Sequence, residues 1–169
     1  MTVTDLSVAS YSRSLDTENL AALVREFADN PAAWLGVVRF VADERWWTRL
    51  HSDDTVDVWL LTWVQDTGTD LHDHGISAGA FTVVSGRLEE VRPTGRRGAL
   101  ASTALSAGRV RRIEPGAVHD VRSPSKVPAI SIHAYSPPLR EMTFYEPAVS
   151  GAAPVPTRTV ATAADWSPA

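Results

Sequence analysis

The chain has 169 residues, a formal net charge of −4 at pH 7 and no cysteine. The length indicates one domain with a substantial core, and the missing cysteines exclude a disulfide framework, a cysteine-ligated zinc site and a cysteine nucleophile. The charge gives no reason to expect nucleic acid or an anionic membrane as a partner. No stretch resembles a signal peptide or a membrane span. We therefore expect a cytoplasmic protein, as a monomer or a small homo-oligomer.

Residues 1–40 are expected to form a leader and a short helical pair that packs on the rest of the domain. Asp16 or Thr17 is suited to cap the first helix, and Pro31 is suited to begin a second one that runs to Val38. Apolar side chains recur at the three- and four-residue spacing of a helical face. They are Leu20, Leu23, Val24 and Phe27.

Residues 41–147 carry short segments rich in β-branched and aromatic residues, separated by glycine and proline turns. Many short strands of this kind indicate a mainly β fold, either a sandwich or a small barrel. Residues 148–169 show little pattern and are expected to form a tail that wraps the domain or is mobile. The expected strands cover residues 55–64, 72–84, 88–91, 99–105, 109–113, 118–121, 129–135 and 142–145.

His72 and His74 stand two residues apart, so their side chains share one face if the backbone is extended. His119 follows the turn sequence Pro115-Gly116 and can supply a third imidazole. Three neutral imidazoles make a compact metal site with open positions. The alternative, three separately hydrogen-bonded polar residues, would suit one histidine better than this paired spacing.

These residues resemble the two-motif arrangement of the cupin superfamily, which implies a jelly-roll β-barrel. The glutamate that most cupins place after the paired histidines is absent, and Gly79 stands where it is expected. The metal would then keep its full dipositive charge and would lower the pKa of a bound thiol. The matching residues of the first motif are Gly68, His72, His74 and Gly86; those of the second are Gly108, Pro115, Gly116, Ala117, Val118 and His119.

With the segment Ser131-Ile132-His133-Ala134-Tyr135-Ser136-Pro137-Pro138, the chain resembles thiol dioxygenases of the cysteine dioxygenase family over roughly residues 40–145. The resemblance implies iron(II) bound by His72, His74 and His119, and a cis bond between Ser136 and Pro137. It also implies a relay of Ser131, His133 and Tyr135. These three residues alternate along a strand, so they share a face and can form one hydrogen-bond chain. The alternative is a solvated outer face of an antiparallel sheet.

The same resemblance implies that Arg49, in Trp47-Thr48-Arg49, binds a substrate carboxylate through its two-pronged guanidinium. Tyr135 is expected to contact the substrate as well. Trp47 departs from the tyrosine expected at its position. Gly79 also stands where animal members carry a cysteine that is crosslinked to the tyrosine, so Tyr135 is expected to be unmodified.

The resemblance implies a small thiol and dioxygen as substrates, and Arg49 favours conversion of L-cysteine to cysteine sulfinate. A second interpretation within this class is oxidation of 3-mercaptopropionate or another small thiol. A third is a non-catalytic cupin that binds a small ligand, which would not need the serine–histidine–tyrosine row. A fourth is a cupin that uses nickel or manganese, because imidazole ligands alone do not select among these metals.

Overall fold

The computed structural model describes residues 14–94, 99–147 and 152–162. The helical elements are α1 (Thr17–Ala28) and two 3₁₀ turns, η1 (Pro31–Ala33) and η2 (Leu35–Val37). The strands are β1 (Trp46–Ser52), β2 (Asp57–Trp63), β3 (His72–Asp73), β4 (Ala78–Ser85), β5 (Arg87–Thr94), β6 (Ala99–Ser106), β7 (Val110–Ile113), β8 (Asp120–Arg122), β9 (Ala129–Ser136), β10 (Glu141–Glu146) and β11 (Val155–Ala161).

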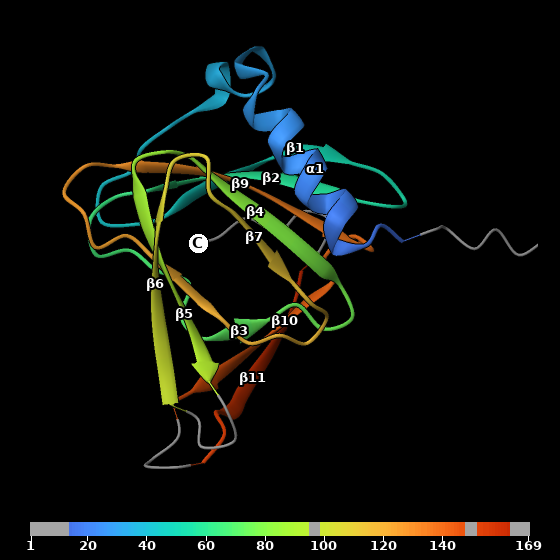
Figure 1. Ribbon diagram of the computed structural model, residues 1–169, viewed down its shortest axis with the longest axis vertical. Helices are drawn as coiled ribbons and strands as arrows, with labels where there is room; N and C mark the ends of the chain where they lie inside the picture. Colours follow the sequence, from blue (N-terminus) through green and yellow to red (C-terminus); the bar gives the residue numbers. More distant parts are fainter. Residues whose placement is uncertain (1–13, 95–98, 148–151, 163–169) are drawn as a thin grey trace, which may run out of the picture.

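The strands form one five-stranded sheet, β1-β2-β9-β4-β7, and two three-stranded sheets, β11-β10-β3 and β6-β5-β8. All the strand pairs are antiparallel. The sheets surround a common interior, and α1 lies outside them against β4, β7 and β9 (Figure 1). This arrangement confirms the prediction of a mainly β barrel with short N-terminal helices.

Helix α1 begins as its sequence predicts. The Asp16 carboxylate accepts a 2.8 Å hydrogen bond from the backbone N–H of Asn19 and so satisfies one free donor of the first turn. Leu20, Ala21 and Val24 are fully buried against the outer face of the five-stranded sheet. The predicted second helix is instead two 3₁₀ turns, because Trp34 between them has φ −142° and breaks the helical path.

The segment through the paired histidines differs from the single long strand that we predicted. Strand β3 ends at Asp73, whose carboxylate accepts a 2.9 Å hydrogen bond from the N–H of Gly75. Gly75 has φ +56°, a conformation that glycine adopts without steric cost, and the chain turns there before β4 begins. Local hydrogen bonding by the aspartate therefore ends the strand between the two histidines.

The chain after Pro147, which shows little pattern in the sequence, contributes strand β11. It pairs with β10 from Glu141 to Glu146 and completes the sheet that contains His72. The expected hairpin at Gly86 joins β4 and β5, and a side chain there would collide with the Pro128 carbonyl at 2.6 Å. The peptide bond between Ser136 and Pro137 is cis, as the resemblance implied.

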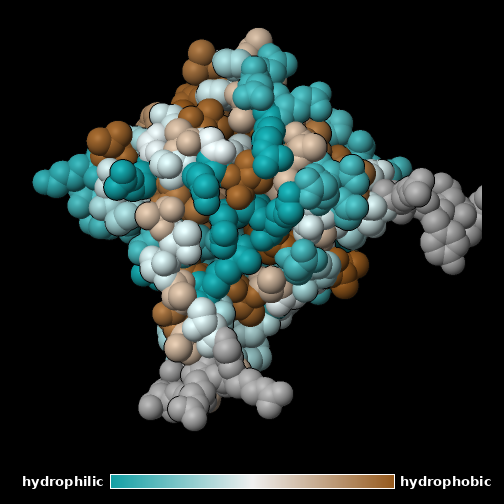
Figure 2. Space-filling view, in the orientation of Figure 1, coloured by the Kyte–Doolittle hydropathy of each residue, from teal (hydrophilic) through white to brown (hydrophobic). Residues whose placement is uncertain are grey.

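On the face shown in Figure 2, apolar residues are exposed in small separate groups among polar ones. Scattered apolar exposure of this kind is normal for a protein surface. Within the described ranges, no helix is both long and apolar enough to cross a membrane.

Candidate active site

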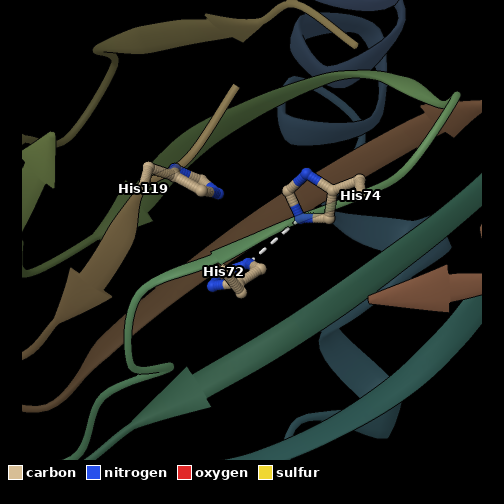
Figure 3. Close-up of side chains that lie close together, drawn as sticks. All are labelled: His72, His74 and His119. Atoms are coloured by element: carbon tan, nitrogen blue, oxygen red, sulfur yellow. Dashed lines mark hydrogen bonds between the residues drawn. The ribbon is translucent and has the colours of Figure 1, made fainter. Parts of the chain in front are cut away.

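Three histidines from different parts of the barrel converge on one point (Figure 3). His72 lies in β3, His74 follows that strand, and His119 immediately precedes β8. The backbones of His72 and His119 exchange two hydrogen bonds, of 2.8 and 2.9 Å, and this pairing holds the third imidazole opposite the first. The ligand atoms of the three side chains all lie within 4.8 Å of one another, and each residue is at most 2 % exposed.

The outer nitrogens of two of these rings are held by acceptors. The Nδ1 of His72 donates to the Asp70 carbonyl at 2.9 Å, and the Nδ1 of His119 donates to the Glu90 carboxylate at 3.0 Å. A ring that donates from Nδ1 while neutral presents the lone pair of Nε2 to the centre. Burial also lowers the pKa of His72 and His74 well below the usual value, so these rings are neutral.

The arrangement fits a metal ion. The Nε2 atoms of His72 and His74 are 3.1 Å apart and point to a shared position. The Nε2 of His119 is buried and has no hydrogen-bond partner among the described residues. A buried nitrogen lone pair without a partner costs free energy, and a metal ion bound by all three rings would remove that cost.

Glu90, on β5, is a site residue that our sequence reasoning missed. Its side chain is fully buried and is contacted by Arg92, Arg111 and His119. Burial would raise the pKa of this carboxyl, but the hydrogen bonds from His119 and Arg92 outweigh burial and hold the pKa at about 2. The alternation of β5 places Glu90 on the same inward face as Leu88, and that pattern was the available signal.

The side chains of Ser131, His133 and Tyr135 are buried and form one hydrogen-bonded row. Ser131 Oγ lies 2.8 Å from Nε2 of His133, and the Tyr135 hydroxyl lies 3.3 Å from Nδ1 of the same ring. The Tyr135 ring also packs on the His74 ring, with centroids 4.6 Å apart. The hydrogen-bonded row therefore contacts the three-histidine centre through the Tyr135 ring.

Trp63, on β2, extends the relay and was also missed from the sequence. Its indole N–H donates a 2.8 Å hydrogen bond to Ser131 Oγ. Because an indole can only donate, the serine oxygen accepts there and its own proton is free for His133. The imidazole proton then resides on Nδ1 and faces the Tyr135 oxygen, which leaves the phenolic proton available to the pocket.

Burial fixes the charge states of the relay. The pKa of His133 is lowered to about 3, first by burial and then by the nearby His119. Burial raises the pKa of the Tyr135 phenol above its ordinary value, and the positive charge of Arg45 offsets this only in part. Near neutral pH the row thus consists of a neutral imidazole and a protonated phenol.

The pocket beside the centre is mostly apolar, with a few polar side chains. Arg49, the predicted carboxylate ligand, is not among the lining residues. It lies over the Trp59 ring at 4.4 Å, and its Nε is 3.9 Å from the buried carboxylate of Asp57. Arg45 lines the pocket instead. The lining residues are Arg45, Trp47, Trp59, Leu61, Thr69, His72, His119, Val121, His133, Tyr135, Leu139, Met142 and Thr162.

Comparison with known proteins agrees with this geometry. The sequence matches the family model of cysteine dioxygenase type I over residues 3–148. The chain belongs to the cysteine dioxygenase type I family. Cysteine dioxygenase type 1 of Danio rerio is 24 % identical over 153 residues, which cover 80 % of this chain and 72 % of that protein. Family membership implies a dioxygenase whose substrates are a small thiol and dioxygen.

Solved structures support the fold. A Klebsiella pneumoniae protein with a double-stranded β-helix domain aligns with a TM-score of 0.52 and 20 % identity, over 75 % of this chain and 90 % of its own. A cupin superfamily protein of Desulfitobacterium hafniense aligns with a TM-score of 0.52 and 9 % identity, over 62 % of this chain and 87 % of its own. The barrel is thus a cupin barrel, and in this dioxygenase family its three clustered histidines indicate a metal site.

Proposed function

We propose that this member of the cysteine dioxygenase family is an iron(II)-dependent thiol dioxygenase that converts L-cysteine to cysteine sulfinate. A thiolate and dioxygen together contain every atom of a sulfinate, so the reaction needs no external reductant. The observation that carries the proposal is the contact between the Tyr135 ring and His74, which joins a three-imidazole centre to a hydrogen-bond relay in one pocket. A non-catalytic ligand-binding cupin would not need that relay.

The proposed metal ligands are His72, His74 and His119. Iron(II) bound there would supply the open positions and the electron transfer that thiol oxygenation requires. Because all three ligands are neutral, the site keeps its positive charge and favours the thiolate form of a substrate. Asp70 and Glu90 hold two of the rings in place through their outer nitrogens.

The proposed catalytic residues are Tyr135, His133 and Ser131. The phenol stays protonated and donates a hydrogen bond into the pocket, where negative charge is present on the sulfur or on oxygen. His133 stays neutral and orients the phenol, and Ser131 orients His133 through its 2.8 Å contact. The apolar lining excludes water, which strengthens these hydrogen bonds.

Oxidation of 3-mercaptopropionate is a second candidate, and one observation favours it. No aspartate or glutamate is among the residues that line the pocket in the described part of the chain. The ammonium group of cysteine would therefore gain no ion pair there, whereas a thiol carboxylate without an amine needs none.

Oxygen uptake by the iron(II)-loaded protein tests the proposal, with L-cysteine and 3-mercaptopropionate compared in parallel and sulfinate measured in the same samples. We expect uptake matched by sulfinate, and the ratio of the two kcat/KM values identifies the substrate. The variants His72→Ala and His119→Ala should bind no iron and show no turnover. Iron-loaded wild-type protein that consumes no oxygen with either thiol would contradict the proposal.

A further inference from the structure

One side of the pocket is formed by residues of strand β10, of the loop before it and of the chain after β11. Leu139, Met142 and Thr162 line the pocket together with two of the histidines. Leu139 and Thr162 are half-buried, whereas His72 and His119 are at most 2 % exposed. The two half-buried residues therefore lie nearer to solvent than the histidine centre does.

The pairing of β11 with β10 brings Thr162 to this position. Val160 of β11 lies opposite Met142 of β10, and Ala161 lies opposite Glu141. Side chains alternate along an extended chain, so Thr162 shares the face of Val160 and Met142. The match to the family model ends before β11 begins, so a segment beyond the matched part supplies this portion of the pocket wall.

Thr162 makes two hydrogen bonds to the loop that joins β9 to β10. Its backbone N–H donates to the carbonyl of Arg140 at 2.7 Å, and its hydroxyl donates to the carbonyl of Leu139. The loop begins with Pro137 and Pro138, which have no N–H, so it has few donors with which to fix its own path. Among the described residues, no other hydrogen bond holds Leu139 or Arg140.

The small size of the pocket makes the position of Leu139 important. The cavity volume is about 50 Å³. A single buried water needs roughly 10–15 Å³ of cavity, so there is room for only a few groups of that size. The wall that Leu139 forms therefore limits how long a bound thiol can be.

We propose that Thr162 holds Leu139 against the pocket and so restricts the site to short thiols. The inference rests on the proposed thiol dioxygenase function and adds to it the residue that sets the length of the substrate. Thr162 is a positioning residue, because its hydroxyl fixes the loop while the leucine side chain meets the far end of the substrate. A longer thiol has to displace that side chain and, with it, the hydrogen bond from Thr162.

The test compares the binding of 3-mercaptopropionate with that of 6-mercaptohexanoate, a longer homologue with the same thiol and carboxylate. Binding to iron(II)-loaded protein is measured by calorimetry without oxygen, so the readout does not depend on turnover. We expect the wild type to prefer the short thiol by about tenfold or more. Thr162→Val keeps the shape of the side chain without the hydroxyl and should reduce this preference by about three- to tenfold. Leu139→Ala, which removes the wall itself, should reduce it at least as much.

Thr157→Val is the matched variant. The Thr157 hydroxyl donates to the Phe144 carbonyl at 3.2 Å, so it joins the same two strands, but neither residue lines the pocket. This variant should keep the wild-type preference, and so should Thr162→Ser, which keeps the hydroxyl. All binding is measured below the melting transition of every variant, where a purely structural loss leaves the ratio of the two affinities unchanged.

An unchanged preference in Thr162→Val or Leu139→Ala would overturn the inference. The same loss in Thr157→Val or Thr162→Ser would also overturn it, as would a wild type that binds both thiols equally or binds neither. If the wild type selects the short thiol through Thr162 but consumes no oxygen, the proposed function fails and the role of Thr162 stands. Turnover by the wild type with an unchanged preference in Thr162→Val leaves the proposed function standing and removes the role of Thr162.

Discussion

Glu90 accepts a 3.0 Å hydrogen bond from the outer nitrogen of His119, and both side chains are fully buried. Two arginines, Arg92 and Arg111, bind the same carboxylate. The carboxylate thus keeps its negative charge inside the barrel, fixes the proton of His119 on Nδ1 and turns Nε2 toward the metal position. Carboxylate–histidine pairs of this kind raise the basicity of a metal ligand.

Replacing Glu90 with glutamine should lower the affinity for iron(II) by about 10- to 100-fold. The amide keeps the shape of the side chain but removes the charge that holds the His119 proton. Competition with a chelator measures the effect. Glu89→Gln is the matched control, because Glu89 points away from the interior and contacts Ser102 on β6. Equal iron affinity in the two variants would show that Glu90 does not support the metal ligand.

Replacing Trp63 with phenylalanine should lower kcat on the order of tenfold and leave the iron content unchanged. The ring that contacts Arg45 is kept, but the N–H donor to Ser131 is lost, and one hydrogen bond of about 1.4 kcal/mol corresponds to this factor. Steady-state kinetics and iron analysis on the same preparation provide the measurement. Trp46→Phe is the control, because Trp46 pairs with Thr62 of β2 and packs on the side of the sheet that α1 covers; this variant should keep wild-type kcat. A Trp63→Phe enzyme with full kcat would remove the indole from the relay.

Replacing Gly79 with alanine should destabilise the protein by about 1–3 kcal/mol and lower kcat. The new methyl group would lie 3.1 and 3.2 Å from two Tyr135 ring carbons and 3.3 Å from the end of Ile113. Contacts this short force the phenol ring or the strands apart. Urea unfolding and kinetics measure both effects. Gly36→Ala, where no atom lies within 4 Å of the new methyl, should change neither, and a neutral Gly79→Ala would show that the Tyr135 ring can shift freely.

The stability of the protein should fall as the pH drops from about 6.5 toward 3, and His133 should account for part of this fall. The imidazole of the unfolded chain takes up a proton near pH 6.5, whereas the folded protein holds the pKa of His133 at about 3. Between these two pKa values the unfolded chain binds one more proton than the folded protein. Lowering the pH through this range therefore lowers the free energy of unfolding, by up to about 1.4 kcal/mol per pH unit for one group.

Urea unfolding at pH 6.5 and 5.5, at matched metal content, measures this contribution. His133→Gln cannot take up the proton, so its free energy of unfolding should fall less steeply over the interval than that of the wild type. The other buried histidines are common to both proteins and cancel in the difference. Parallel slopes would show that His133 does not stay neutral in the folded protein.

Much of the fold follows from local sequence signals. The apolar spacing and the Asp16 cap of α1, the short strands between glycine and proline turns, and the hairpin at Gly86 are confirmed. These features depend on neighbours in sequence, which is why they could be read from it. The second helical segment begins at Pro31 as predicted, but it forms two short 3₁₀ helices, because the backbone of Trp34 interrupts it. Strand β11, of sequence Val-Pro-Thr-Arg-Thr-Val-Ala, was not predicted, although its valines and threonines were an available signal; it is an edge strand that is held by pairing with β10.

The sequence by itself determined which residues could form the centre, because the spacing of His72 and His74 and the alternation of Ser131, His133 and Tyr135 are properties of adjacent positions. Only the tertiary structure decided which distant side chains support them. Glu90 meets His119, Trp63 meets Ser131, and Arg45 rather than Arg49 lines the pocket. Such contacts depend on which strands pair and in which register. The sequence alone does not show, for example, that Arg49 lies beside Asp57.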